Sequence, residues 1–120
     1  MTSDRALDPK VIASLRQLTN PGEPDVLAEV LQLFLDEAPK KLRSLQTALG
    51  TGDASQAARL AHSLKGSSGN IGAASMRDLC GRIDEQAKSG DLRRIAPLLA
   101  SLTDEYQRVE LEIKQLLQTS

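Results

Sequence analysis

Residues 92–116 of the chain have the sequence LRRIAPLLASLTDEYQRVELEIKQL. Such a stretch predicts a helix when its apolar residues recur at alternating steps of three and four, because one side of the helix is then apolar. This spacing is typical of helices that cross a partner at a small angle in a left-handed bundle. At about 1.5 Å per residue the helix would span roughly 40 Å, although Pro97 is expected to bend its first turns. The apolar positions are Leu92, Ile95, Leu99, Leu102, Tyr106, Val109, Ile113 and Leu116.

Four further segments show helical spacing, and no part of the chain shows convincing strand alternation. In the second segment Pro39 is expected to kink or locally open the helix, and Gly50 to end it. Because the connections are short, sequential helices should be antiparallel neighbours. The sequence predicts one all-α domain over residues 1–120, an up-and-down four-helix bundle (25–118) with a short N-terminal helix and loop (1–22). The four segments follow Asp8-Pro9 as far as Asn20, run from near Asp25 to Leu49, start at Asp53, and run from near Ser75 to Gly90.

Composition excludes several classes of protein. With 15 basic and 16 acidic side chains, the chain lacks the broad positive field of nucleic-acid binders. The only aromatic residues, Phe34 and Tyr106, provide no stacking platform for single strands. Cys80 has no disulfide or zinc-binding companion and is expected to be a small buried hydrophobe. Since neither a signal peptide nor a membrane-spanning stretch is present, we expect a cytosolic, monomeric domain that does not insert into membranes.

Chemistry is concentrated in RLAHSLKGSSGNIG, residues 59–72. At about 100° per residue, His62 lies roughly 120° from the centre of the apolar stripe, so its ring should point towards solvent. Gly66 follows it by one turn and Gly69 by nearly two, on a similar side of the helix. A glycine inside a helix costs about 1 kcal/mol relative to alanine, so the pair needs a reason. Either the helix ends at Lys65 and a flexible loop follows, or the helix continues with bare backbone on which a second macromolecule can land.

The residues around His62 limit the kinds of reaction and ligand that this site could serve. Lys65 is close enough to supply positive charge to an anion on the imidazole. It precedes the glycines, and no strand leads into them, so the sequence has no P-loop or dinucleotide fingerprint. Ser63 cannot form a catalytic pair with His62, because adjacent helical residues point about 100° apart. The acidic pairs Asp36-Glu37 and Asp84-Glu85 are interpreted as solvated helix faces.

This stretch resembles the signature of histidine-containing phosphotransfer (HPt) domains, the relay modules of bacterial multistep phosphorelays. The match is specific at AHSLKGSS (61–68) and NIGA (70–73), and the resemblance extends over nearly the whole chain. In that family the third helix continues past the glycine, which favours the bare landing surface over the loop. Supporting matches lie at Leu7-Asp8-Pro9, Leu33-Phe34-Leu35, Gly52-Asp53 and Leu79-Cys80.

The resemblance implies a phosphotransfer carrier with no ATP-dependent kinase activity of its own. His62 would accept a phosphoryl group from the phospho-Asp of one receiver domain and pass it to an Asp of another. Lys65 would stabilise the phosphoryl oxygens, and Gly66 would leave room for the loops of the receiver. No cofactor is expected, because the receiver would bring Mg²⁺. The implied partners are response-regulator receiver domains and a hybrid sensor histidine kinase.

Residues around this centre would contribute to docking. Gly69 and Ser63 are expected to belong to the surface on which the partner docks. Arg59 could reach the phosphate or the receiver, although an exposed, solvated arginine is the simpler interpretation. Ser67 and Ser68 are expected to bond to the backbone or to pack tightly, and not to react.

Alternative functions stay open at this stage. A passive helical adaptor would bind a partner without chemistry, and a degenerate relay domain would dock receivers without transferring phosphate. The presence of His62, Lys65 and Gly66 together favours an active domain. An enzyme that uses His62 as a general base is disfavoured, because no substrate pocket or orienting carboxylate is evident nearby. The sequence fits both a free-standing protein and the terminal domain of a hybrid sensor kinase.

Overall fold

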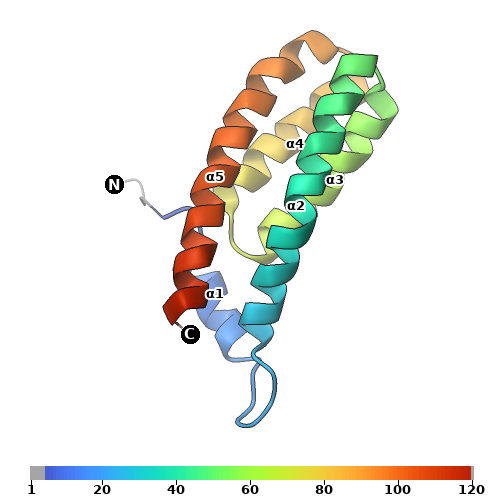
Figure 1. Cartoon of the computed structure of the whole chain (residues 1–120). Coiled ribbons are helices and arrows are strands. Elements are labelled where there is room, and N and C mark those ends of the chain that lie inside the picture. Colours follow the sequence, from blue (N-terminus) through green and yellow to red (C-terminus); the bar gives the residue numbers. More distant parts are fainter. Residues whose placement is uncertain (1–4, 120) are drawn as a thin grey trace.

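A computed structural model of the chain describes residues 5–119, and these residues form five α-helices, one short 3-10 helix and no strand. The expected all-α class is therefore confirmed (Figure 1). The elements are α1 (Pro9–Arg16), α2 (Val26–Thr51), α3 (Ala54–Asn70), α4 (Ala74–Ser89), η1 (Leu92–Arg94) and α5 (Ile95–Thr119).

The helices α2, α3, α4 and α5 run up and down as a four-helix bundle (Figure 1). The helices α3 and α4 pack most extensively on each other, while α2 flanks α3 and α5 flanks α4. This leaves α5 diagonally across the bundle from α3. The longer helices α2 and α5 extend past the other two, and α1 lies between them at that end.

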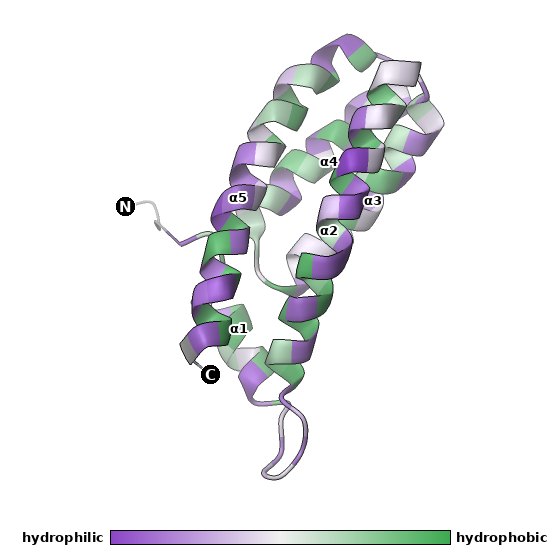
Figure 2. Ribbon diagram, viewed as in Figure 1, coloured by the Kyte–Doolittle hydropathy of each residue, from purple (hydrophilic) through white to green (hydrophobic). Residues whose placement is uncertain are grey.

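The core is aliphatic, as the scarcity of aromatic residues required. Each helix alternates hydrophobic and hydrophilic residues around its circumference (Figure 2), which is the pattern of a helix with one buried face. The rings of Phe34 and Tyr106 lie 6.1 Å apart between α2 and α5. Within residues 5–119, no helix combines the length and apolarity needed to cross a membrane. Among the fully buried side chains are Leu31, Leu45, Leu64, Met76, Ile83, Leu102 and Ile113.

The structure corrects the expected course of α2. Gly50 does not end the helix, which continues to Thr51 and is capped by Gly52 in the left-handed conformation (φ 72°). Gly50 lacks this positive φ, so it is simply a helical residue. The expected local opening at Pro39 is also wrong, because α2 is one uninterrupted helix through this position. A missing N–H removes one backbone hydrogen bond, and packing along the rest of the helix outweighs that loss.

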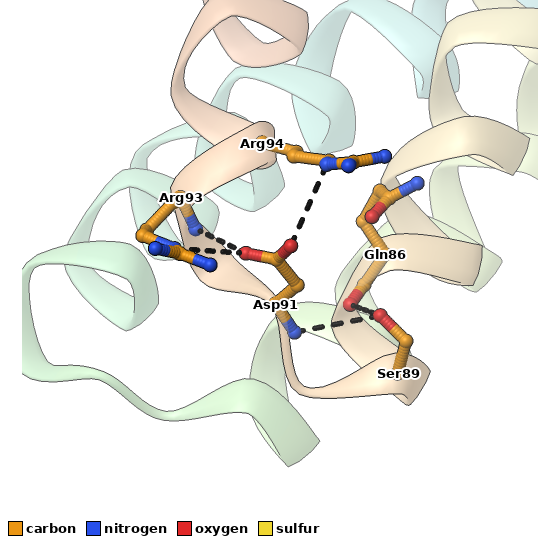
Figure 3. A network of polar contacts seen from close by, with 5 residues as sticks. All are labelled: Gln86, Ser89, Asp91, Arg93 and Arg94. Carbon is orange, nitrogen blue, oxygen red and sulfur yellow. Dashed lines mark hydrogen bonds and ion pairs between the residues drawn. The ribbon is translucent and has the colours of Figure 1, made fainter.

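The expected fifth helix is divided in two. The 3-10 helix η1 precedes α5, and Asp91 caps it by accepting hydrogen bonds from the backbone N–H (3.3 Å) and Nε (3.4 Å) of Arg93 (Figure 3). The same carboxylate lies 3.5 Å from Nε of Arg94. Because α5 begins at Ile95, Pro97 falls in its first turn. A backbone N–H has no intrahelical partner there, so the proline removes no hydrogen bond of the helix.

The N-terminal segment is fastened to two helices of the bundle. The backbone N–H of Asp8 donates to the carbonyl of Gly72 in the α3–α4 connection at 2.8 Å. On α5, the Glu112 carboxylate accepts hydrogen bonds from the backbone N–H groups of Ala6 and Leu7. The segment before α1 therefore helps to hold the α3–α4 connection in place.

Candidate functional site

The helix α3 continues through both glycines and ends at Asn70, so the loop interpretation is wrong. Two serine hydroxyls are hydrogen-bonded to the backbone of this part of the helix. Ser67 Oγ and Ser68 Oγ donate to the backbone carbonyls four residues earlier, at 2.9 Å and 2.7 Å. Ser68 is also fully buried, which anchors this turn against the bundle. The backbone contacts expected of both serines are confirmed, and Gly66 and Gly69 lie on a regular helix.

His62 projects into solvent from the middle of α3. Its side chain is 73% exposed, which confirms the orientation expected from the helical spacing. Its ring nitrogen Nδ1 lies 3.4 Å from Oδ2 of Asp84 on the neighbouring helix α4. One nitrogen of the ring thus faces the protein, and the other is available to a partner.

Asp84 was expected to be solvated together with Glu85, but it is buried. Its side chain is only 8% exposed, and Nζ of Lys88 lies 3.3 Å from the same Oδ2 atom that faces His62. Within residues 5–119, the other oxygen, Oδ1, has no hydrogen-bond partner. A signal was present in the sequence, since Asp84 follows Cys80 by four residues and Ile83 by one, on the apolar side of α4. The expectation of a solvated helix face was wrong for Asp84, whereas Asp36, Glu37 and Glu85 are exposed as expected. The expected lack of an orienting carboxylate was also wrong.

The Asp84 carboxylate determines which nitrogen of the ring can react. A carboxylate beside one imidazole nitrogen favours the tautomer that carries the proton there. With the proton on Nδ1, the lone pair lies on Nε2, at the exposed side of His62. A buried carboxylate at this position would also stabilise positive charge on the ring if Nε2 formed a bond. The geometry suits a nucleophilic imidazole.

A shallow depression of about 380 Å³ lies beside the ring; we call it the His62 depression. Four of the six site residues predicted from the sequence line it. The other two lining residues, Asn70 at the end of α3 and Arg77 on α4, were not predicted. An added Cβ at Gly66 would find no atom within 4 Å, so this position is open to an approaching molecule. The residues that line the His62 depression are His62, Lys65, Gly66, Gly69, Asn70 and Arg77.

Two of the predicted site residues, Ser63 and Arg59, do not line the His62 depression. Ser63 is half-buried on the side of α3 that faces α2, where its hydroxyl accepts a hydrogen bond from Nζ of Lys41 at 2.7 Å. Arg59 is exposed, and its guanidinium donates to the side-chain oxygen of Gln56. Both are thus engaged within the chain, in directions away from the ring.

The single cysteine is chemically quiet. Cys80 is fully buried, and this burial raises the pKa of its thiol to about 12, although a hydrogen bond with Ser68 acts in the opposite direction. The thiolate is the reactive form, so the side chain is an inert part of the core. Within residues 5–119, no group of three or more His, Cys, Asp or Glu side chains is placed to hold a metal ion.

Comparisons with known proteins show the family to which this fold belongs. Residues 29–118 match the family described as Hpt domain. Histidine-containing phosphotransfer protein B from Pseudomonas aeruginosa PAO1 has the same fold, with a TM-score of 0.90 at 34% identity over 98% of this chain and 99% of that one. The HPT domain of a hybrid histidine kinase from Shewanella gives a TM-score of 0.79 at 26% identity over 96% of each chain.

Sequence relatives include both small proteins and a large kinase. Histidine-containing phosphotransfer protein 2 of Arabidopsis thaliana is 30% identical over 105 residues, which cover 85% of this chain and 67% of that protein. The signal transduction histidine-protein kinase BarA of Escherichia coli K12 is 31% identical over 105 residues, 87% of this chain but only 11% of the kinase. The resemblance seen in the motif is therefore confirmed, and the chain belongs to the Hpt domain family, the histidine phosphotransfer domains of two-component signalling.

Proposed function

We propose that the protein is a phosphorelay intermediate that accepts a phosphoryl group on Nε2 of His62 from the phospho-Asp of a receiver domain. It then passes the group to an Asp of another receiver domain. Membership of the Hpt domain family implies a phosphorelay role. The observation that carries the finer proposal is a 73% exposed imidazole whose Nδ1 faces a buried carboxylate 3.4 Å away.

The transfer step needs no proton acceptor. The Nε2 lone pair attacks the phosphorus of the aspartyl phosphate in line, and the bond from phosphorus to the Asp oxygen breaks as the carboxylate leaves. The ring keeps its Nδ1 proton and becomes cationic, and the Asp84 carboxylate at 3.4 Å offsets that charge. Transfer to the next receiver reverses these steps and restores the neutral ring.

In this proposal Lys65 neutralises the phosphoryl oxygens. Its side chain is half-buried and runs across α4, where a Cβ at Gly81 would lie 3.7 Å from Cε and 3.9 Å from Nζ. Because Gly81 has no side chain, there is room for the lysine to lie along α4. Lys65 lines the His62 depression together with the ring that would carry the phosphoryl group.

The shape of the site favours a folded domain as the partner over a small molecule. The His62 depression is shallow and open, unlike the enclosed pockets that bind small substrates. With an open surface at Gly66 beside the ring, a folded domain can bring its own reactive carboxylate to Nε2. We expect the partners to be response-regulator receiver domains, with a hybrid sensor histidine kinase as the source of phosphate.

The decisive experiment incubates the full chain with a panel of phosphorylated receiver domains. We expect acid-labile, base-stable phosphate on the protein, and none on His62→Gln with an unchanged circular dichroism spectrum. Since the chain has 1 histidine, the phosphoramidate can form at no other imidazole. In the same assay Asp84→Asn should keep the label but accept it about tenfold more slowly, as for other residues that orient a functional histidine. Labelling of His62→Gln would exclude the proposed mechanism, and a wild-type chain that binds receivers without label would be a passive adaptor.

A further inference from the structure

Arg77 on α4 lies against a glycine of α3. A Cβ atom at Gly69 would lie 3.3 Å from Cδ of Arg77 and 3.5 Å from its Nε. The arginine side chain therefore crosses from its own helix onto the bare backbone of the neighbouring one. Gly66 differs, because an added Cβ there would meet nothing within 4 Å. The absence of a side chain at Gly69 gives room to Arg77.

Lys65 makes the reciprocal crossing from α3 to α4. Its aliphatic stem lies over Gly81, with the nearest atom 3.7 Å from a Cβ placed there. Two cations from two helices thus lie across two glycines, in opposite directions. Both line the His62 depression. The juxtaposition concentrates positive charge along the His62 depression.

This positive charge is not neutralised within the described chain. Among residues 5–119, neither Lys65 nor Arg77 forms an ion pair or a side-chain hydrogen bond. Of the two acidic residues in the adjoining hollow, Asp78 is paired with Arg82 at 3.1 Å, and Glu85 is exposed. The guanidinium of Arg77 is therefore available to an anion from outside.

The position of Arg77 in its helix is electrostatically unfavourable. It is near the start of α4, a helix whose first turn has no acidic residue and whose N-cap, Ala73, makes no side-chain hydrogen bond. The N-terminal end of a helix carries partial positive charge, which disfavours a nearby cation. A residue that breaks a local rule without an internal partner points to an external role.

We propose that Arg77 is a docking residue that binds a carboxylate on the surface of the receiver domain as that domain approaches His62. This inference rests on the proposed function. Gly69 follows His62 by seven residues, so Arg77 lies about 10 Å along the α3 axis from the ring. Lys65, one turn from His62, reaches the phosphoryl group, whereas Arg77 reaches the partner beyond it. A receiver that lacks an acidic residue at this point of contact is then a poorer partner.

The test measures the initial rate of transfer to the full chain from the phosphorylated receiver that labels His62 fastest in the panel. For Arg77→Glu we expect the half-saturating receiver concentration to rise about tenfold, as for charge reversal at other complementary interfaces. The rate at saturation and the hydrolysis rate of the phospho-His62 adduct should not change. The control Lys114→Glu reverses a charge on α5, which lies diagonally across the bundle from α3 and His62. It should alter the half-saturating concentration by less than about twofold.

Each outcome separates this inference from the proposed function. If the wild-type chain accepts no phosphoryl group, the proposed function fails and this inference falls with it. If Arg77→Glu saturates like the wild type, only the docking role is wrong. If the adduct lifetime changes while the half-saturating concentration does not, Arg77 contacts the phosphoryl group, and the docking role is again wrong.

A second variant tests the support that Gly69 gives to Arg77. In Gly69→Ala the added methyl group would press on Cδ of Arg77, so the half-saturating concentration should rise a few-fold although alanine favours the helix. In an Arg77→Ala background the same change should have no further effect. If the two effects multiply instead, the methyl group obstructs the receiver directly, and the assignment of Gly69 as the support of Arg77 is overturned.

Discussion

The two ends of α3 are built by different rules. At its start, Gly52 in the left-handed conformation ends α2, and the Asp53 carboxylate caps α3 by accepting from the Gln56 N–H at 3.0 Å. The α4–α5 connection repeats this arrangement with Gly90 and Asp91 (Figure 3). At the other end of α3, the connection to α4 has no such pair, and α4 begins without a side-chain cap.

Long-range contacts replace the missing local signals at the α3–α4 connection. Gly72 has a positive φ of 76°, and its carbonyl accepts from the Asp8 N–H at 2.8 Å. A Cβ at this glycine would lie 2.9 Å from Cβ of Val11 and 3.1 Å from Cβ of Asp8. The Gly-Asp connections are therefore specified by neighbouring residues, whereas the connection near the bare surface of α3 is specified by packing against the N-terminal segment.

The largest expected effect comes from Gly72→Ala. It combines an unfavourable left-handed conformation with a steric clash against Val11, so the free energy of unfolding should fall by about 2–4 kcal/mol. The matched control is Gly52→Ala, which has a similar φ but no atom within 4 Å of the new Cβ and should lose about 1 kcal/mol. Urea unfolding of both variants measures the difference. Equal losses would show that packing adds nothing at the α3–α4 connection.

A smaller effect is expected at the other end of α3. Asp53→Ala removes the carboxylate that accepts from the Gln56 N–H, which should lower the free energy of unfolding by about 1 kcal/mol. Asp53→Asn is the control, because asparagine caps a helix nearly as well. Thermal unfolding should separate the two variants, while transfer to His62 stays at the wild-type rate. A loss as large as that of Gly72→Ala would break the distinction between the two ends.

The same distinction explains how much of the fold the sequence could predict. Helix starts at Asp8, Asp25 and Asp53 were correct because an N-cap acts on the backbone of its own first turn. The end of α2 was misplaced by two residues, since composition does not show which of Gly50 and Gly52 has the positive φ. Propensity alone left the course of α3 through its glycines undecided, because buried contacts stabilise that part of the helix.

The candidate site also combines features that local sequence signals predict with features that depend on contacts between helices. The exposure of His62 and its position beside Lys65 could be predicted, because helical spacing within one segment is sufficient for both. Asp84 was misinterpreted and Arg77 was not singled out, because each acquires its importance from the contact of α4 with α3. Such pairings join residues far apart in the sequence, and a single sequence carries no local signal for which side chains will meet.

The smallest expected change in stability concerns Gly66. A glycine is unfavourable inside a helix, and no contact within the described chain requires one at this position. Since nothing lies within 4 Å of a new Cβ, Gly66→Ala should raise the free energy of unfolding by about 0.5–1 kcal/mol and yet slow transfer from the receiver. Gly50→Ala is the matched control, a helical glycine with equally open space near the Gly52-Asp53 connection, and should gain stability with no change in transfer. Chemical unfolding and labelling rates on the same samples test both statements. If Gly66→Ala transferred as fast as Gly50→Ala, the bare surface beside His62 would have no steric function, and its glycine would be an unexplained cost to the helix.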